Sequence, residues 1–130
     1  MRDRNVQRPV YLIRVAQGQS RVADLEAFSR ASALLKGDDV PFKVVEASGG
    51  DLGDHSVFVI PEEFEEQAFG LALTYRQPFV IYLAFDRVAY RTDSRWRGPD
   101  KVLGEFKAIT GARSGEVFVD NNRNQAYAIV

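Results

Sequence analysis

The stretch HSVFVIPEEFEEQAFGLALTYRQPFVIYLAF, residues 55–85, decides the fold prediction because it contains a strand, a helix and a second strand in succession. Residues 55–60 are short and rich in β-branched and aromatic side chains, which is typical of a strand. Pro61 suits the first position of a helix, and the glutamates that follow it favour a helix N-terminus. Residues 79–85 form the strongest strand candidate of the chain. The helix between them has one apolar stripe, formed by Phe64, Ala68, Leu71 and Tyr75.

The preceding part of the chain predicts a second unit of this kind. Residues 10–16, VYLIRVA, favour a strand that is buried on both faces. A helix is expected from an N-cap at Ser20 to a stop at Gly37. A strand from Pro41 and a Gly-rich loop over residues 48–54 then lead to the strand at 55–60, so these two strands are expected to form a hairpin.

Residues 98–130 are expected to add a short helix and a hairpin. Gly98, Pro99 and Asp100 are typical of a helix start, and Gly111 of a helix end. A polar turn at residues 121–124 separates two apolar segments, 116–120 and 125–130, which predicts a terminal hairpin. The apolar stripe of the expected helix is Val102, Leu103, Phe106 and Ile109.

The order of elements therefore predicts an α+β fold over residues 1–130 as a single domain. Its first six elements match a ferredoxin-like βαββαβ core, in which helices pack on an antiparallel or mixed sheet. The short helix and the C-terminal hairpin extend this core. The fold class alone implies no function, because such folds serve enzymes, nucleic-acid binders and dimerisation modules alike.

The composition excludes several kinds of site. The chain has 130 residues, no cysteine and one histidine, which excludes disulfides, thiol nucleophiles and cysteine- or histidine-rich metal sites. We therefore expect no metal and no cofactor. A formal net charge of −1 argues against a protein that binds nucleic acid with its whole surface. No signal peptide or membrane-spanning stretch is recognisable, so a cytoplasmic location is expected.

The near-neutral total conceals a segregation of charge along the chain. Residues 44–75 contain seven acids and no lysine or arginine, whereas residues 76–113 contain eight bases and four acids. Opposite charges on one molecule can steer a partner or pair across a symmetric dimer. The simpler interpretation is a capped helix and a set of solvated arginines.

The basic segment supplies the candidate binding residues. Arg and Trp are used for phosphate and base stacking, and they also dominate protein–protein hot spots. A structural role for the tryptophan at the edge of the core is the alternative. Tyr82, Phe85, Tyr90 and Trp96 are also candidates for lining a small-molecule pocket. The predicted binding residues are Tyr82, Arg87, Tyr90, Arg91, Arg95, Trp96 and Arg97.

Three further patterns resemble catalytic or anion sites only weakly. His55 with Asp51 and Asp54 could form a general base, but no nucleophile accompanies it. The turn at residues 17–20 could offer backbone amides to an anion, although it lacks the glycines and lysine of a phosphate-binding loop. The letters of a metal-dependent nuclease motif recur at Pro99, Asp100, Glu105 and Lys107 with a spacing too short for that chemistry.

The leading prediction is therefore a non-enzymatic binding or regulatory module that acts through protein contacts as a homodimer. A small-ligand-binding protein or enzyme, and a nucleic-acid binder that uses residues 87–101, remain as alternatives.

Overall fold

The computed structural model describes residues 8–18, 20–48, 55–109, 117–120 and 125–130 of the chain. Strands predominate over helices in these ranges. The elements are β1 (Val10–Arg14), α1 (Arg21–Gly37), β2 (Lys43–Ser48), β3 (His55–Pro61), the 3-10 helix η1 (Glu62–Phe64), α2 (Glu65–Thr74), β4 (Phe79–Leu83), β5 (Val88–Asp93), β6 (Pro99–Ile109), β7 (Val117–Asp120) and β8 (Gln125–Ile129).

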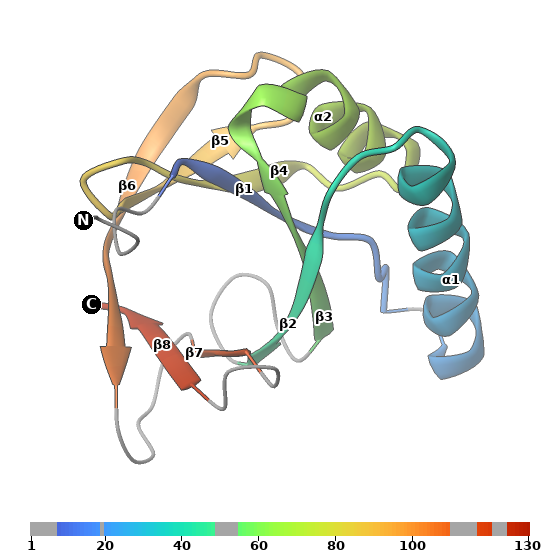
Figure 1. Cartoon of the computed structure of the whole chain (residues 1–130), viewed down its shortest axis with the longest axis horizontal. Helices are drawn as coiled ribbons and strands as arrows, with labels where there is room; N and C mark the ends of the chain where they lie inside the picture. Colours follow the sequence, from blue (N-terminus) through green and yellow to red (C-terminus); the bar gives the residue numbers. More distant parts are fainter. Residues whose placement is uncertain (1–7, 19, 49–54, 110–116, 121–124) are drawn as a thin grey trace.

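The strands form a closed antiparallel barrel (Figure 1). Around the barrel the order is β1-β3-β2-β7-β8-β6-β5-β4, and β4 pairs with β1 to complete the circle. On the opposite side, a seam between β2 and β7 joins two segments that are far apart in sequence, with Glu46 opposite Val119. Closure gives each described strand a neighbour on both sides, which limits edge-to-edge association.

The predicted ferredoxin-like α+β fold is wrong. The chain does run strand, helix, strand, strand, helix, strand from β1 to β4, but the sheet does not stop there. The strands β5, β6, β8 and β7 continue it from β4 around to β2. An open sheet with helices packed on it is thereby replaced by a closed barrel that carries two helices on its outside.

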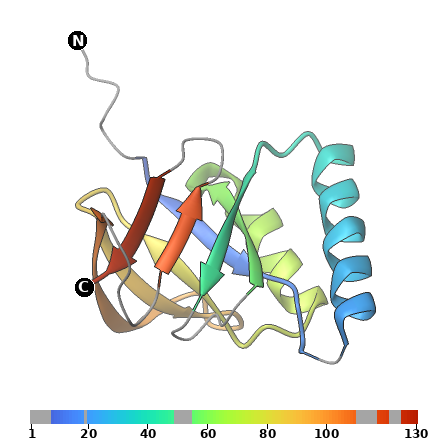
Figure 2. The same cartoon turned by 90° about the horizontal axis from the view of Figure 1, so that it is seen from below.

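Both helices lie over the same side of the barrel (Figure 2). The helix α2 contacts β1, β3 and β4. The helix α1 is attached mainly through Ala31 and Leu35, which are buried, and through Phe28, whose ring stacks on that of Phe58 at 4.7 Å. The strands β6, β7 and β8 lie away from the helices, whereas the turn after β5 reaches α2, where Arg97 pairs with Glu66.

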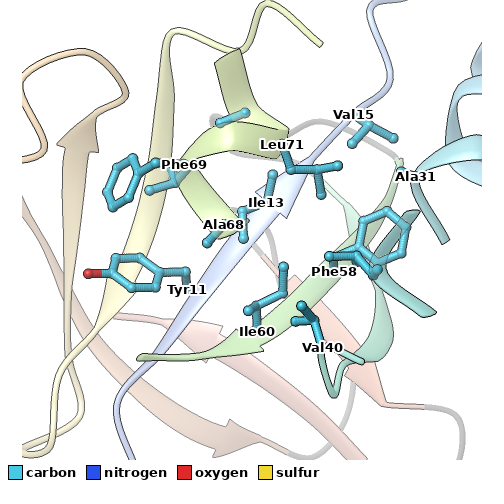
Figure 3. Close-up of a cluster of buried hydrophobic side chains, with 13 residues drawn as sticks. Tyr11, Ile13, Val15, Ala31, Val40, Phe58, Ile60, Ala68, Phe69 and Leu71 are labelled. Carbon is cyan, nitrogen blue, oxygen red and sulfur yellow. The ribbon is translucent and has the colours of Figure 1, made fainter. Parts of the chain in front are cut away.

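The strands under the helices separate two hydrophobic cores. Successive side chains of a strand point to opposite faces, so alternate residues of β1, β3 and β4 face the helices or the barrel interior. The outer core, shown in Figure 3, includes Tyr11, Ile13, Phe58, Ile60, Val80, Ala31, Leu35, Ala68, Phe69 and Leu71. The inner core includes Leu12, Val57, Val59, Ile81, Leu83, Ala89, Phe106 and Phe118.

The predicted helix over residues 98–111 is also wrong, because β6 occupies this segment. Pairing between β5 and β6 is irregular at Ala89/Tyr90 and at Arg91/Thr92. Such bulges disturb the simple alternation of a strand, so apolar residues recur at a spacing that imitates a helix. Gly104 has a φ of +142°, and a Cβ there would collide with the carbonyl oxygen of Val130. The geometry of β6 therefore requires glycine at this position.

Other local predictions are confirmed or adjusted. Ser20 is the N-cap of α1, since its side chain accepts a hydrogen bond from the Ala23 amide at 3.0 Å. Both predicted hairpins form, β2 with β3 and β7 with β8. Pro61 ends β3 instead of beginning α2. Of the loop predicted at 48–54, Ser48 belongs to β2, and residues 49–54, with Asp51 and Asp54, lie outside the described residues. Gly111 and the turn at 121–124 lie outside them as well.

In the ranges that the structure describes, neither helix is long and apolar enough to cross a membrane.

Candidate functional site

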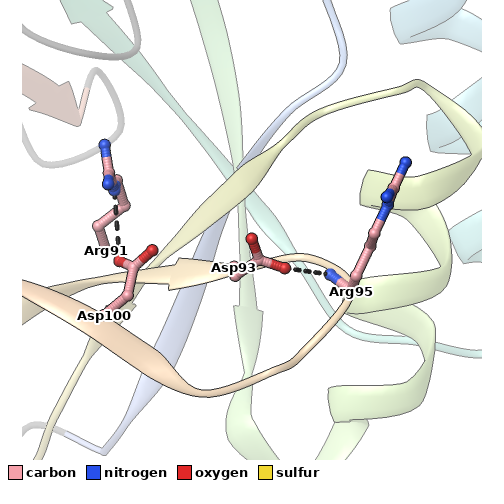
Figure 4. A network of polar contacts seen from close by, with 4 residues as sticks. All are labelled: Arg91, Asp93, Arg95 and Asp100. Carbon is pink, nitrogen blue, oxygen red and sulfur yellow. Dashed lines mark hydrogen bonds and ion pairs between the residues drawn. The ribbon is translucent and has the colours of Figure 1, made fainter.

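The turn between β5 and β6 is held in one conformation by hydrogen bonds. The carboxylate of Asp93 accepts the backbone N–H groups of Arg95 at 2.8 Å and Trp96 at 3.0 Å. Figure 4 shows the first of these bonds and the side chain of Arg95, which extends away from Asp93. The Arg97 amide donates to the Asp93 carbonyl at 2.8 Å, and Arg97 has a φ of +57°. Aspartate favours such turns because its side chain bonds to nearby backbone amides.

The same turn is anchored to the segment that follows α2. Ser94 is buried, its hydroxyl donates to the carbonyl of Gln77 at 2.7 Å, and its amide donates to the carbonyl of Pro78 at 3.1 Å. The buried Gln77 amide group in turn donates to the Ala16 carbonyl at 3.0 Å. The turn and the end of α2 thus form one continuous surface.

This surface exposes a tryptophan beside a hollow. Trp96 is 83% exposed and Leu73 is 46% exposed. The hollow has a volume of ≈ 570 Å³, and both residues line it together with Arg76 and Arg95. We call Leu73, Arg76, Arg95 and Trp96 the hairpin surface. Gln77, Pro78, Asp93 and Ser94 complete the lining.

The two arginines of the hairpin surface are not neutralised by nearby acids. Among the described residues, neither Arg76 nor Arg95 forms an ion pair. Asp93, which also lines the hollow, uses its carboxylate to hold the turn. The surface therefore combines an exposed indole, an exposed leucine and two available positive charges.

The three other predicted arginines lie in three different places. Arg97 donates to Glu66 at 2.7 Å and lies over the Phe69 ring at 5.1 Å. Arg91 pairs with Asp100 at 3.3 Å (Figure 4). Arg87, in the turn between β4 and β5, donates to the carbonyl of Phe106 at 3.2 Å. The structure therefore brings Arg95 and Trp96 together at the hollow, whereas the side chains of these three arginines bond to other groups of the chain.

Tyr82 and Tyr90 belong to a separate tyrosine cluster on the barrel wall. They are paired across β4 and β5 with ring centroids 6.5 Å apart, and Tyr82 lies 5.1 Å from Tyr11. The Tyr82 hydroxyl donates to Glu62 at 2.6 Å, and the Tyr11 hydroxyl donates to Glu65 at 2.9 Å. These bonds fasten the acidic start of α2 to the sheet.

Burial and neighbouring carboxylates change the acidity of this cluster. Burial, reinforced by the hydrogen bond to Glu62, raises the pKa of Tyr82 to about 12. Burial and Glu65 likewise raise the pKa of Tyr11. The hydrogen bond from Arg97 lowers the pKa of Glu66 below its usual value. The phenols therefore stay protonated donors at neutral pH, as expected for structural anchors.

A second hollow lies between α1 and the strands β2 and β3. It has a volume of ≈ 600 Å³, and Phe28, Glu46 and Ser56 are among its lining residues, as is His55. The Ser56 hydroxyl bonds to both oxygens of the Glu46 carboxylate at 2.9 and 3.0 Å. The predicted general base combined His55 with Asp51 and Asp54. Both aspartates lie outside the described residues, so this combination stays a prediction.

The turn before α1 is already occupied by internal bonds. The backbone amide of Gln17 donates to the Asp24 carboxylate at 3.0 Å. This amide, which was predicted as a donor to a bound anion, therefore already bonds to an acid of the chain itself. Among the described residues, no three His, Asp or Glu side chains form a group that could hold a metal ion.

Comparison of the chain with protein families and with curated proteins finds no match.

Sequence reasoning named Arg95 and Trp96 but missed Leu73 and Arg76. Leu73 lies in the last turn of α2, and Arg76 follows the residue that caps its C-terminus. Their proximity to the turn results from the anchoring of Ser94 on Gln77 and Pro78. The sequence offered one signal, since Leu73 is an apolar residue outside the predicted stripe of the helix.

Proposed function

We propose that this protein is a non-catalytic binding module that contacts a protein partner through the hairpin surface. The observation that carries the proposal is Trp96, which is 83% exposed on a turn fixed by its own hydrogen bonds. Exposing a large aromatic side chain to water is unfavourable, since it forgoes burial of apolar area. Tryptophan and arginine are also the residues that most often dominate protein interfaces.

The rigidity of the turn supports binding. Ordering a loop or a side chain on association costs free energy, and a preformed surface avoids part of that cost. Here the Asp93 carboxylate and the buried Ser94 fix the backbone on both sides of Arg95. The partner would therefore bind a turn whose backbone conformation is already fixed.

A protein fits this surface better than a nucleic acid does. Affinity for nucleic acid rises with the number of phosphates that Lys and Arg contact. Within the predicted segment 87–101, Arg91 and Arg97 are paired with Asp100 and Glu66, respectively. A few unpaired cations around an apolar centre are more typical of a protein interface.

The proposal is tested by photo-crosslinking in cells. A photoreactive phenylalanine analogue replaces Trp96 in one variant and Phe85 in a control, since Phe85 is also exposed, at 63%, in the turn between β4 and β5. We expect a discrete protein adduct from position 96 and none from position 85. Equal labelling at both positions, no protein adduct, or an adduct with nucleic acid alone would overturn the proposal.

We also propose that the protein is located in the cytoplasm, and cell fractionation tests this location.

A further inference from the structure

We infer that the hairpin surface binds an acidic segment of its partner, in which carboxylates flank an apolar side chain. This inference rests on the proposed function and names the chemistry of the partner. Its basis is the set of side chains that line the hollow beside Trp96, and the charges among them that have no partner within the chain.

Two separate segments form the hollow, and each supplies one apolar side chain and one cation. The end of α2 supplies Leu73 and, just beyond the helix, Arg76. The turn between β5 and β6 supplies Trp96 and Arg95. All four side chains belong to exposed residues. An occupant can therefore cover the leucine and the tryptophan with an apolar group while it brings charged groups to both arginines.

The size of the hollow and the remaining lining residues suit a segment of polypeptide. Its volume of ≈ 570 Å³ lies within the roughly 300–1,000 Å³ of ligand clefts. Gln77 and Ser94, which also line it, are buried and hydrogen-bonded within the chain. Contacts with an occupant are therefore left mainly to the four exposed side chains.

The hollow carries an excess of positive charge. Asp93 is the one acid among its described lining residues, and the carboxylate of Asp93 already accepts two backbone amides of the turn. Arg76 and Arg95 outweigh it, and neither forms an ion pair within the described ranges. Guanidinium groups bind carboxylates through paired, charge-assisted hydrogen bonds. Charge complementarity therefore favours an occupant that supplies carboxylates.

The next arginine of the turn shows the interaction that we expect. Arg97 follows Trp96, and its guanidinium donates to the carboxylate of Glu66 at 2.7 Å. The chain thus supplies an acid to the arginine on one side of the tryptophan. On the other side, Arg95 has no ion-pair partner among the described residues. We expect a partner carboxylate to bind Arg95 as Glu66 binds Arg97.

The chain contains an acidic segment of its own, but a second copy is a poorer occupant than a different protein. Residues 62–66 read EEFEE, an aromatic residue between glutamates. Three of these glutamates accept hydrogen bonds from side chains of the same chain, and Phe64 packs against the outer core. A second copy would have to break these contacts before its segment could enter the hollow.

The decisive experiment is a selection of short random peptides displayed on phage. The targets are the full wild-type chain and a charge-reversed variant that combines Arg76→Glu with Arg95→Glu. We expect the wild-type chain to enrich peptides with Asp or Glu on both sides of a leucine or an aromatic residue. The charge-reversed variant should lose these peptides and enrich basic ones, because both attractions become repulsions.

Trp96 reports the binding of a selected peptide directly, because it is the only tryptophan of the chain. Its fluorescence emission should move to shorter wavelength as the indole leaves water. In titrations at low salt, the charge-reversed variant should bind the acidic peptide about tenfold more weakly than the wild-type chain. Added salt should weaken binding to the wild-type chain, since the charges involved are exposed.

A matched control separates the position of the charges from their number. The variant that combines Arg21→Glu with Lys101→Glu makes the same change in net charge at exposed residues of α1 and β6, outside the lining of the hollow. It should bind the selected peptide as the wild-type chain does. Circular dichroism and thermal unfolding check that each variant is folded. Arg95→Glu alone, which leaves the end of α2 unchanged, should weaken binding about threefold.

Several results would overturn this inference. They are the absence of enriched peptides, the enrichment of neutral or basic peptides by the wild-type chain, and the enrichment of the same acidic peptides by the charge-reversed variant. Tighter binding of single-stranded DNA than of the selected peptide would also contradict it. So would a dimer of the chain alone that the charge reversal abolishes, because the occupant would then be a second copy.

The crosslink from position 96 distinguishes this inference from the proposed function. Mass spectrometry of the adduct identifies the partner segment that lies against the hairpin surface. A segment without acidic residues would leave the proposed function standing and overturn the inference. If no protein is crosslinked, both proposals fail.

Discussion

The two halves of the barrel wall differ in what covers them. The covered wall consists of β4, β1, β3 and β2, whose outward side chains pack in the outer core under the helices. The bare wall consists of β7, β8, β6 and β5, and β6 exposes Lys101, Val102, Glu105 and Lys107. Strands buried on both faces have continuous apolar sequences, whereas strands with one wet face mix polar and apolar residues. The difference explains why the covered wall is easier to find in the sequence.

The largest expected effect tests this comparison with one residue type on both walls. Ile60 is fully buried in the outer core, whereas Ile109 is partly exposed on β6. Ile60→Ala should lower the free energy of unfolding by about 2–5 kcal/mol, because it removes buried methylenes and leaves a cavity. Ile109→Ala should cost less than half as much. Urea unfolding of both variants measures the difference, and equal losses would show that the walls are covered alike.

The next effect concerns the backbone of the bare wall. Gly104→Ala should lower the free energy of unfolding by about 1–3 kcal/mol, because it forces a side chain into a left-handed conformation. Its Cβ would also meet the Val130 carbonyl, which accepts the Glu105 amide at 2.8 Å. Urea unfolding checks this, with Gly98→Ala as the control because a Cβ there meets nothing within 4 Å. Similar stability of both variants would contradict the strand geometry.

The covered wall also explains how much of the fold the sequence predicts. The segments 10–16, 55–60 and 79–85 are recognisable because both of their faces are apolar, and α1 is recognisable by its Ser20 cap. Barrel closure was missed because it depends on pairings between distant segments, such as Glu46 with Val119. On the bare wall, bulges and Gly104 obscured the alternation of β6.

The residues of the candidate site likewise divide into those that local sequence indicates and those that only tertiary contacts bring together. Arg95 and Trp96 stand out locally, as an aromatic residue between cations. Leu73 and Arg76 join them only through tertiary contacts that no local pattern encodes. Tyr11 was predicted only as a strand residue, and Tyr82 was also predicted to bind a ligand or partner. Their bonds to Glu65 and Glu62 depend on how η1 and α2 pack on β1 and β4.

A smaller effect tests the tyrosine cluster that fastens α2 to the covered wall. Tyr82→Phe should cost about 1 kcal/mol at neutral pH, because it removes the hydrogen bond to Glu62. Its pH dependence is more specific. The pKa of Tyr82 is raised from 10.0 to about 12 in the folded chain, so the contribution is complete below pH 10 and is lost as the pH rises through 12.

Urea unfolding between these pH values measures the loss. The wild-type chain should lose stability more steeply than Tyr82→Phe as the pH rises above 10. Parallel curves for the two proteins would show that the phenol is not held by the carboxylate.

The smallest effect has the opposite sign. Gly70→Ala should raise the free energy of unfolding by about 0.5–1 kcal/mol, because alanine is the better helix former and its Cβ enters open space. Thermal unfolding measures this gain. A loss of stability would mean that α2 needs glycine for its own packing.

The seam between β2 and β7 has a consequence for protein synthesis. On the ribosome, the covered wall and both helices emerge before residues 117–130, which supply β7 and β8. Until then, β2 lacks one of its two neighbours and keeps an open edge beside Glu46. The nascent chain therefore passes through a stage in which it can pair with other chains. The finished barrel pairs that edge with β7, so its exposure is confined to the period of synthesis.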